Sequence, residues 1–222
     1  MRALIRFGKQ PRLRFISHLD LQRFFQRAVN RTGLPVAWSQ GFNPHPVMSF
    51  ASALALGWTS EYEILDIRLS APIGRKRIEE AVRAALPEDL PVLEVRTVED
   101  RHPAPMALVR MSDYAVRLEG ETASAVLDAI PVFLGMREYA AVRKTKSGER
   151  QVDIRPMAVS LERTEKGFDC RLMLTEQNTL KPDLLIRALA ETAEVAPPEA
   201  SIHRMRLLGE DAFGNLRPLM EL

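Results

Sequence analysis

Residues 17–35 constrain the fold most, because they carry a full set of signals for one amphipathic helix. Ser17 is a residue type that caps helix N-termini, and Asp20 stands three positions later, where a carboxylate suits the cap and the helix dipole. Apolar side chains then recur at helical spacing, at Leu21, Phe24, Phe25, Ala28 and Val29. Gly33 and Pro35 end the pattern. The segment therefore predicts a helix with one buried face.

The opposite face of this helix is basic and amide-rich, and it belongs to a strongly basic region. Its members are Arg23, Gln26, Arg27, Asn30 and Arg31. Residues 1–50 hold eight Lys and Arg against one acid, and residues 137–155 hold six against three. Residues 51–136 are acidic, with nine basic and fourteen acidic side chains. Two separate basic segments predict an anion-binding surface assembled by folding, although a solvated basic face without a partner is the alternative.

Composition limits the class of protein. A chain of 222 residues with 46% hydrophobic and 27% charged side chains is typical of a globular protein with one or two domains. It has neither an apolar run long enough to span a membrane nor a secretory signal, which predicts a cytoplasmic protein without membrane attachment. Cys170 is the single cysteine, so an intramolecular disulfide and a self-contained iron–sulfur cluster are both excluded.

The order of the expected elements predicts an α+β fold. The first half contains a strand at 3–7, the helix, strands within 47–56 and at 62–69, a helix at 77–86 and a strand at 92–98. This βαββαβ order is that of a ferredoxin-like unit. The second half repeats it with a strand at 107–118, a helix at 122–134, hairpins at 139–154 and 158–175, a helix at 183–192 and a strand at 202–208. We expect two tandem ferredoxin-like units with antiparallel sheets, residues 1–100 and 106–222, the second elaborated by an extra hairpin.

Three segments carry candidate binding residues. At the helix start, backbone amides and His18 are expected to converge with Arg12 and Arg14 on a phosphate, although a plain helix start explains Ser17 and His18 equally well. In the loop at 41–46, prolines restrict Asn43 and His45 to extended conformations, which favours a functional role for these side chains.

Within the same loop, Phe42 either anchors the chain or stacks on a base. Trp38 and Trp58 flank the loop, and core packing is expected for each. The third segment is the first hairpin of the second half, whose basic residues predict phosphate contacts, unless its lysines only deter edge pairing. The complete set predicted to bind nucleic acid is Arg12, Arg14, His18, Arg23, Arg27, Arg31, Asn43, His45, Lys144, Lys146, Arg150 and Arg155.

Several chemistries are not expected. The sequence has no glycine-rich phosphate loop and no nucleophile elbow, and its scattered histidines and lone cysteine do not provide a zinc site. We therefore predict no metal and no cofactor.

The motifs resemble those of a known family. Residues 14–20 (RFISHLD), 39–46 (SQGFNPHP) and 146–156 (KSGERQVDIRP), together with 180–183 and 202–204, make the chain similar to the radical-SAM-associated domain of unknown function, which occurs alone or fused to B12-binding-type radical SAM proteins. The resemblance spans nearly the whole chain. It departs at residues 53–57, where Ala replaces the proline usual in the family. It implies a radical SAM protein as partner and no defined activity.

Three functions follow as hypotheses. The first is a noncatalytic partner of a radical SAM enzyme that binds tRNA or rRNA and presents it for modification. The second is a metal-independent endoribonuclease like those that process CRISPR transcripts, with His18 or His45 as general acid or base. The third is a protein-only adaptor for the radical SAM partner, in which the basic face meets no RNA.

Overall fold

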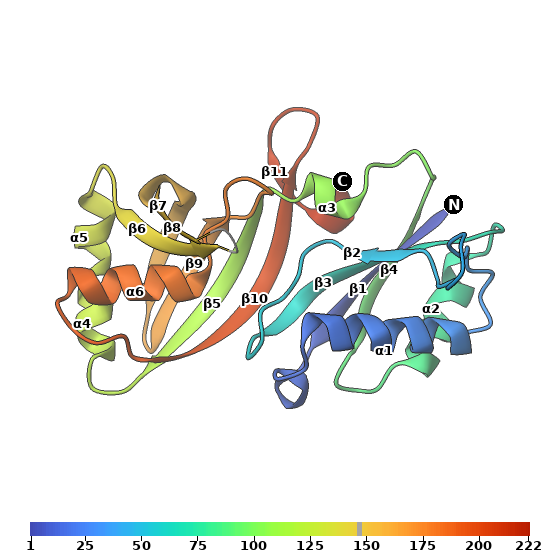
Figure 1. The fold of residues 1–222 in the computed structure, drawn as a ribbon, viewed down its shortest axis with the longest axis horizontal. Helices are drawn as coiled ribbons and strands as arrows, with labels where there is room; N and C mark the ends of the chain where they lie inside the picture. Colours follow the sequence, from blue (N-terminus) through green and yellow to red (C-terminus); the bar gives the residue numbers. More distant parts are fainter. Residues whose placement is uncertain (146–147) are drawn as a thin grey trace. The chain divides into compact units, whose positions relative to one another are not determined.

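The computed structural model describes residues 1–145 and 148–222, and the chain divides into two compact units. Residues 1–109 and 206–222 form the first unit, and residues 110–205 form the second (Figure 1). The sequence indicated the first boundary closely but assigned 206–222 to the second unit. These residues belong to the first because the chain end bonds there: Arg96 donates to the carbonyl oxygens of Met220, at 2.9 Å, and Leu222, while the Met220 amide donates to Tyr62 Oη at 3.2 Å.

The protein is a mixed α+β protein with a large, mostly antiparallel sheet and a few helices. The elements of the first unit are β1 (Arg2–Lys9), η1 (Pro11–Leu13), α1 (His18–Arg31), β2 (Met48–Phe50), β3 (Thr59–Arg68), α2 (Arg75–Ala85), β4 (Val92–Val98), α3 (Pro105–Leu108), β11 (Leu216–Pro218) and η3 (Leu219–Glu221). Strand β1 lies between β3 and β4, and both pairings are antiparallel. The short strand β2 adds to β3.

The core of the first unit lies between one face of β1 and the helices α1 and α2. Strand side chains alternate between faces, so Ala3, Ile5 and Phe7 point to one side, where they cluster with Phe25 of α1 and Ile78 of α2. Burying such side chains stabilises the fold by about 1.5–3 kcal/mol each. The sheet therefore determines which face of α1 is buried and which stays exposed.

Helix α1 confirms the prediction for its segment. The Ser17 hydroxyl accepts a hydrogen bond from the Asp20 amide at 3.2 Å and donates to the Asp20 carboxylate at 2.7 Å. Leu21, Phe25, Ala28 and Val29 are buried, and the helix ends at Arg31, before Gly33 adopts a φ of 67°. The left-handed conformation of Gly33 is available to glycine at little cost, which is why the chain turns there.

The second unit contains β5 (Met111–Glu119), α4 (Ala123–Asp128), α5 (Ile130–Gly135), β6 (Ala140–Thr145), β7 (Gly148–Asp153), η2 (Arg155–Met157), β8 (Ala158–Thr164), β9 (Gly167–Met173) and α6 (Pro182–Thr192). Strand β9 pairs with β5 and β8, and β6 pairs with β7 as a separate two-stranded sheet. Strand β10 (Glu199–Glu210) lies next to β5 in the sheet order. Its residues up to Met205 belong to the second unit, and those from Arg206 belong to the first. Both predicted hairpins are confirmed.

Two predicted elements differ in the structure. The helix expected at 122–134 is divided into α4 and α5, because Pro131 lacks the amide hydrogen that a continuous helix would use and instead lies in the first turn of α5. The strand expected from residue 107 begins at Met111, because Pro105 starts the short helix α3. Within the described residues, no helix is long and apolar enough to cross a membrane.

Gly167 at the start of β9 has no room for a side chain. A Cβ atom there would lie 1.8 Å from the carbonyl oxygen of Val116, and backbone atoms cannot move aside cheaply. We expect Gly167→Ala to lower the free energy of unfolding by about 3 kcal/mol, the upper range for overpacking, as measured by urea denaturation. Gly135→Ala is the matched control, because nothing lies within 4 Å of its Cβ position. Equal unfolding midpoints for the two variants would contradict this account.

Candidate nucleic-acid interface

Helix α1 presents a row of cations to solvent. Arg23, Arg27 and Arg31 follow one another at every fourth position, on the side of the helix opposite its buried residues. Arg23 pairs with Asp20 at 3.3 Å, and Arg31 donates to the Ala85 carbonyl at 3.3 Å. Both contacts are solvent-exposed and therefore contribute little free energy to folding. The row, which we call the arginine face, remains available to phosphates.

The turn before α1 adds two more exposed cations. Arg12 has 86% of its side chain exposed and lies 3.5 Å from Asp89, a distance typical of a weak surface pair. The Arg14 guanidinium lies 4.7 Å from the centre of the Phe15 ring, which orients it without neutralising it. Arg12 and Arg14 therefore precede the arginine face as accessible charges.

A buried ionic cluster holds this turn in place. Lys9 and Glu63 are each 2% exposed, and Lys9 Nζ donates to the carbonyls of Arg14 at 3.1 Å and Ile16 at 3.0 Å. Burial lowers the pKa of Lys9, and the Glu63 charge opposes that shift. Neither residue is among those predicted from the sequence to have a function. The signal was there: Lys9 continues the alternation of Ala3, Ile5 and Phe7 toward the core.

His18 lies partly buried beside this cluster. Its ring packs edge-on against Phe50, with centroids 5.2 Å apart. Burial lowers the pKa of His18, which Glu63 opposes and Lys9 reinforces. The imidazole is therefore mostly neutral at neutral pH, and it offers a hydrogen bond rather than a positive charge.

The lowered pKa of His18 predicts a pH dependence of stability. Between the folded pKa and the unfolded value of about 6.5, the unfolded chain binds more protons, so the free energy of unfolding falls as pH falls through this window. We expect the urea midpoint to drop between about pH 7 and about pH 5, with part of that slope lost in His18→Gln. The same slope in His18→Gln as in the wild type would contradict the assignment.

The loop from Ser39 to His45, here called the 39–45 loop, is closed by its own hydrogen bonds. The Ser39 amide donates to the His45 carbonyl at 2.9 Å, and the His45 amide donates to Ser39 Oγ at 3.1 Å. His45 Nδ1 lies 2.9 Å from Ser39 Oγ and 3.2 Å from the Asn43 carbonyl oxygen. His45 Nδ1 is therefore used in hydrogen bonds within the loop. His45 Nε2 has no protein partner among the described residues. The exposed side chains of Asn43 and His45 are displayed by a closed loop.

His18 and His45 make no contact with each other in the described part of the chain. His18 packs against Phe50, whereas His45 Nδ1 bonds within the 39–45 loop. No contact therefore brings the two imidazoles together into one acid–base site.

In the second unit, the Arg155 side chain forms its hydrogen bonds inside the protein. Its guanidinium donates to the carbonyls of Leu134 at 2.8 Å and Ala158 at 3.2 Å, and it lies 5.7 Å from the ring centre of Phe133. It joins α5 to the start of β8 and is poorly placed to bind phosphate. Arg150 is exposed on β7, opposite Arg143 in register. Of Lys144 only the place in β6 is described, and Lys146 lies outside the described residues.

A cavity of about 520 Å³ lies in the second unit between β6 and α6. Its charged lining is balanced, with Lys181 and Arg187 against Asp183 and Glu191, and none of the sequence-predicted residues lines it. Tyr139 donates to Glu191 at 2.6 Å, and burial together with that carboxylate raises the pKa of Tyr139 to about 12. Across residues 1–145 and 148–222, no group of three or more His, Cys, Asp or Glu is arranged to hold a metal ion.

Fold and site together describe a mixed α+β protein with an exposed basic helix. The chain belongs to the family described as "Uncharacterized protein conserved in bacteria (DUF2344)", which matches residues 2–183. No curated protein matches it.

Two solved structures are similar to the chain. One is a chain of "Crystal Structure of a Cbf5-Nop10-Gar1 Complex", at 11% identity and a TM-score of 0.47, covering 92% of this chain and 48% of that one. This protein thus spans about half of that chain's length. The other is "Crystal Structure of an Unknown Protein from Galdieria sulphuraria", at 11% identity and a TM-score of 0.26, covering 91% of this chain and 97% of that one. Both TM-scores are below 0.5, so neither similarity supports a conclusion about the function of this protein.

Proposed function

We propose that this protein is a noncatalytic RNA-binding subunit that holds tRNA or rRNA for a radical SAM enzyme. The observation that carries the proposal is the arginine face, preceded by Arg12 and Arg14. Five exposed guanidinium groups along one helix and its entry turn match the phosphate contacts that dominate RNA affinity. Asn43 and His45 would read a base edge or a 2′-hydroxyl. Arg150, with Lys144 and Lys146, would make a second contact.

The enzyme partner is proposed from sequence alone. The motifs at 14–20 and 39–46 resemble those of the radical-SAM-associated domain. A radical SAM cluster needs three cysteines, and this chain has one, the buried Cys170. Catalysis would then belong to the partner, and substrate capture to this chain. The same cysteine usage favours a reducing, cytoplasmic location.

We also propose a ferredoxin-like topology for each unit. In the first, the order β1-α1-β2-β3-α2-β4 and the sheet order β4-β1-β3, with β2 on β3, support this assignment. In the second, β5, β8, β9 and β10 would be the four strands, α4 with α5 the first crossover and α6 the second. The β6–β7 hairpin would then be an insertion.

Binding of labelled tRNA and rRNA fragments across a salt series tests the proposed function. With phosphate contacts from the five arginines, affinity should fall by roughly 100- to 500-fold between about 50 and about 200 mM salt. The RNA should remain intact. Flat salt dependence would contradict the electrostatic interface, and cleavage that survives EDTA and is lost in His45→Ala would favour the endoribonuclease instead. Absence of binding to every fragment would favour a protein-only adaptor.

A further inference from the structure

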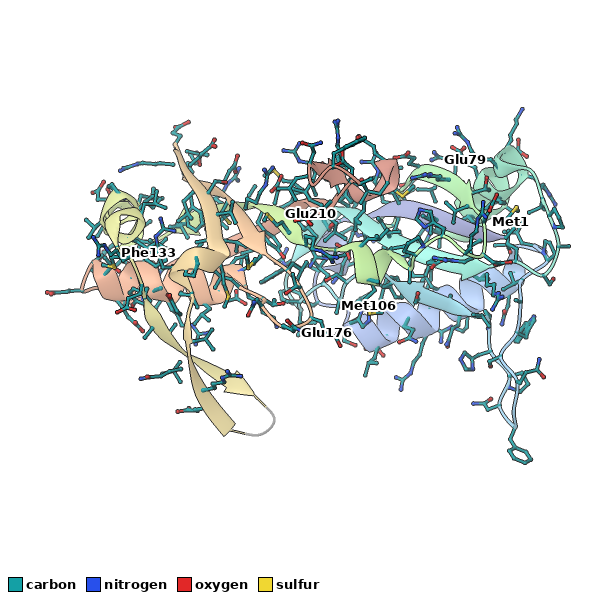
Figure 2. All side chains as sticks on the ribbon, turned by 90° about the horizontal axis from the view of Figure 1, so that it is seen from above. Met1, Glu79, Met106, Phe133, Glu176 and Glu210 are labelled. Carbon is teal, nitrogen blue, oxygen red and sulfur yellow. The ribbon has the colours of Figure 1, made fainter. Side chains whose placement is uncertain are left out.

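The 39–45 loop displays aromatic side chains to solvent. Phe42 is fully exposed and Trp38 is 48% exposed, whereas Trp58, only 6% exposed, belongs to the core. The prediction of core packing is therefore confirmed for Trp58 and wrong for Trp38. In Figure 2 the segment joining α1 to β2 projects away from the rest of the first unit. An exposed Phe forgoes about 1.5–3 kcal/mol of burial.

The loop restricts the conformations available to these rings. Hydrogen bonds between Ser39 and His45 close it, and Trp38 and Pro46 form a β-bridge just outside the closure. Pro44 and Pro46 limit the backbone of the residues before them. The backbone of Asn43 and His45 therefore has little conformational entropy left to lose when a ligand binds, so the loop is suited to binding in its present conformation.

The sequence around the loop is basic, which favours an anionic ligand. Residues 21–60 contain no Asp or Glu, while the arginine face lies within the same stretch. The same loop carries the Asn43 side chain and the His45 ring, which can form hydrogen bonds. A ligand that combines a flat apolar face, a polar edge and a phosphate backbone fits this set, and a nucleotide has all three.

Base pairing decides which nucleotides have a free face. Within a duplex, each base is covered above and below by its neighbours, and the deep, narrow major groove of A-form RNA does not admit side chains. We propose that the 39–45 loop is a site for unpaired nucleotides of RNA, with a base stacked on Phe42. This inference rests on the proposed RNA-binding function and adds a substrate class: RNA with an exposed single-stranded loop or bulge.

A comparison of two RNAs tests this inference. One is a hairpin with an unpaired loop, and the other is a fully paired duplex with the same number of phosphates. We expect the wild type to prefer the hairpin by about 10-fold, the effect of one stacked base, and Phe42→Ala to lose that preference without a change in salt dependence. Phe42→Trp should retain it.

The matched control is Phe213→Ala, which removes a ring that is 90% exposed elsewhere in the first unit. Its binding should equal that of the wild type. Equal affinity of wild type and Phe42→Ala for both RNAs, with salt dependence retained, would overturn the inference and leave the proposed function standing. If the wild type binds neither RNA, both the loop site and the proposed RNA-binding function are contradicted. Phe42 would then indicate an apolar pocket on a protein partner.

Discussion

Reversing Arg23 and Arg27 to Glu will weaken binding to structured RNA by about 100-fold at about 0.1 M salt. Each lost phosphate contact lowers the slope of log affinity against log salt by about 0.9, so two contacts remove close to a factor of 60 at this salt concentration, and repulsion by the new carboxylates adds to it. The Arg23–Asp20 contact is exposed, so its loss will scarcely affect folding. The measurement is an affinity titration at several salt concentrations, in which both the affinity and the slope should fall.

A second double reversal controls for net charge. Lys76→Glu/Arg77→Glu changes the charge by the same amount at the exposed start of α2, where new carboxylates suit the helix dipole. It should retain most of the wild-type affinity. An equal loss in the two variants would mean that overall charge, rather than the arginine face, drives binding. Near-UV circular dichroism of both variants will show whether the fold is kept.

Replacing Lys9 with Met will destabilise the first unit by about 3–5 kcal/mol, because two hydrogen bonds from a buried charged donor are lost, each worth about 1.5–3 kcal/mol. The variant leaves buried Glu63 without this cation and removes the donor to the carbonyls of Arg14 and Ile16. Urea denaturation at neutral pH measures the loss. Lys76→Met, at an exposed lysine of α2, is the control and should have almost no effect.

A double-mutant cycle separates the charge interaction from the lost hydrogen bonds. Glu63→Gln removes the buried negative charge, so Lys9→Met/Glu63→Gln should be less destabilised than the sum of the two single changes. Strict additivity would show that Lys9 acts through the carbonyls of the turn alone. A Lys9→Met protein as stable as the wild type would contradict the buried cluster altogether.

Local signals accounted for much of this fold. The cap at Ser17, the apolar spacing after it and the stop at Gly33 lie within one segment, and α1 has the predicted bounds to within a residue. The two hairpins of the second unit follow from turn residues between short apolar runs. Pro131 is also a local signal, because a proline inside a helical pattern indicates a break such as the one between α4 and α5.

Burial of charged and aromatic residues depended on contacts that a sequence does not display. The sequence predicts the same role, phosphate contact, for Arg150 and Arg155. In the structure Arg155 donates to the carbonyls of Leu134 and Ala158, while Arg150 is exposed. Trp38 and Trp58 read alike as core residues, and only Trp58 is buried. In each pair the difference comes from segments remote in the chain.

By itself, the sequence determined where the helix α1 begins and ends and which of its faces carries the arginines, because capping and helical spacing act over a few residues. Only the tertiary structure decided which cations remain exposed, that Lys9 is buried and donates to the carbonyls of the turn, and that His18 packs against Phe50 while His45 bonds within its own loop. These features depend on strand pairing between β1 and β3 and on desolvation, which arise when distant parts of the chain pack together.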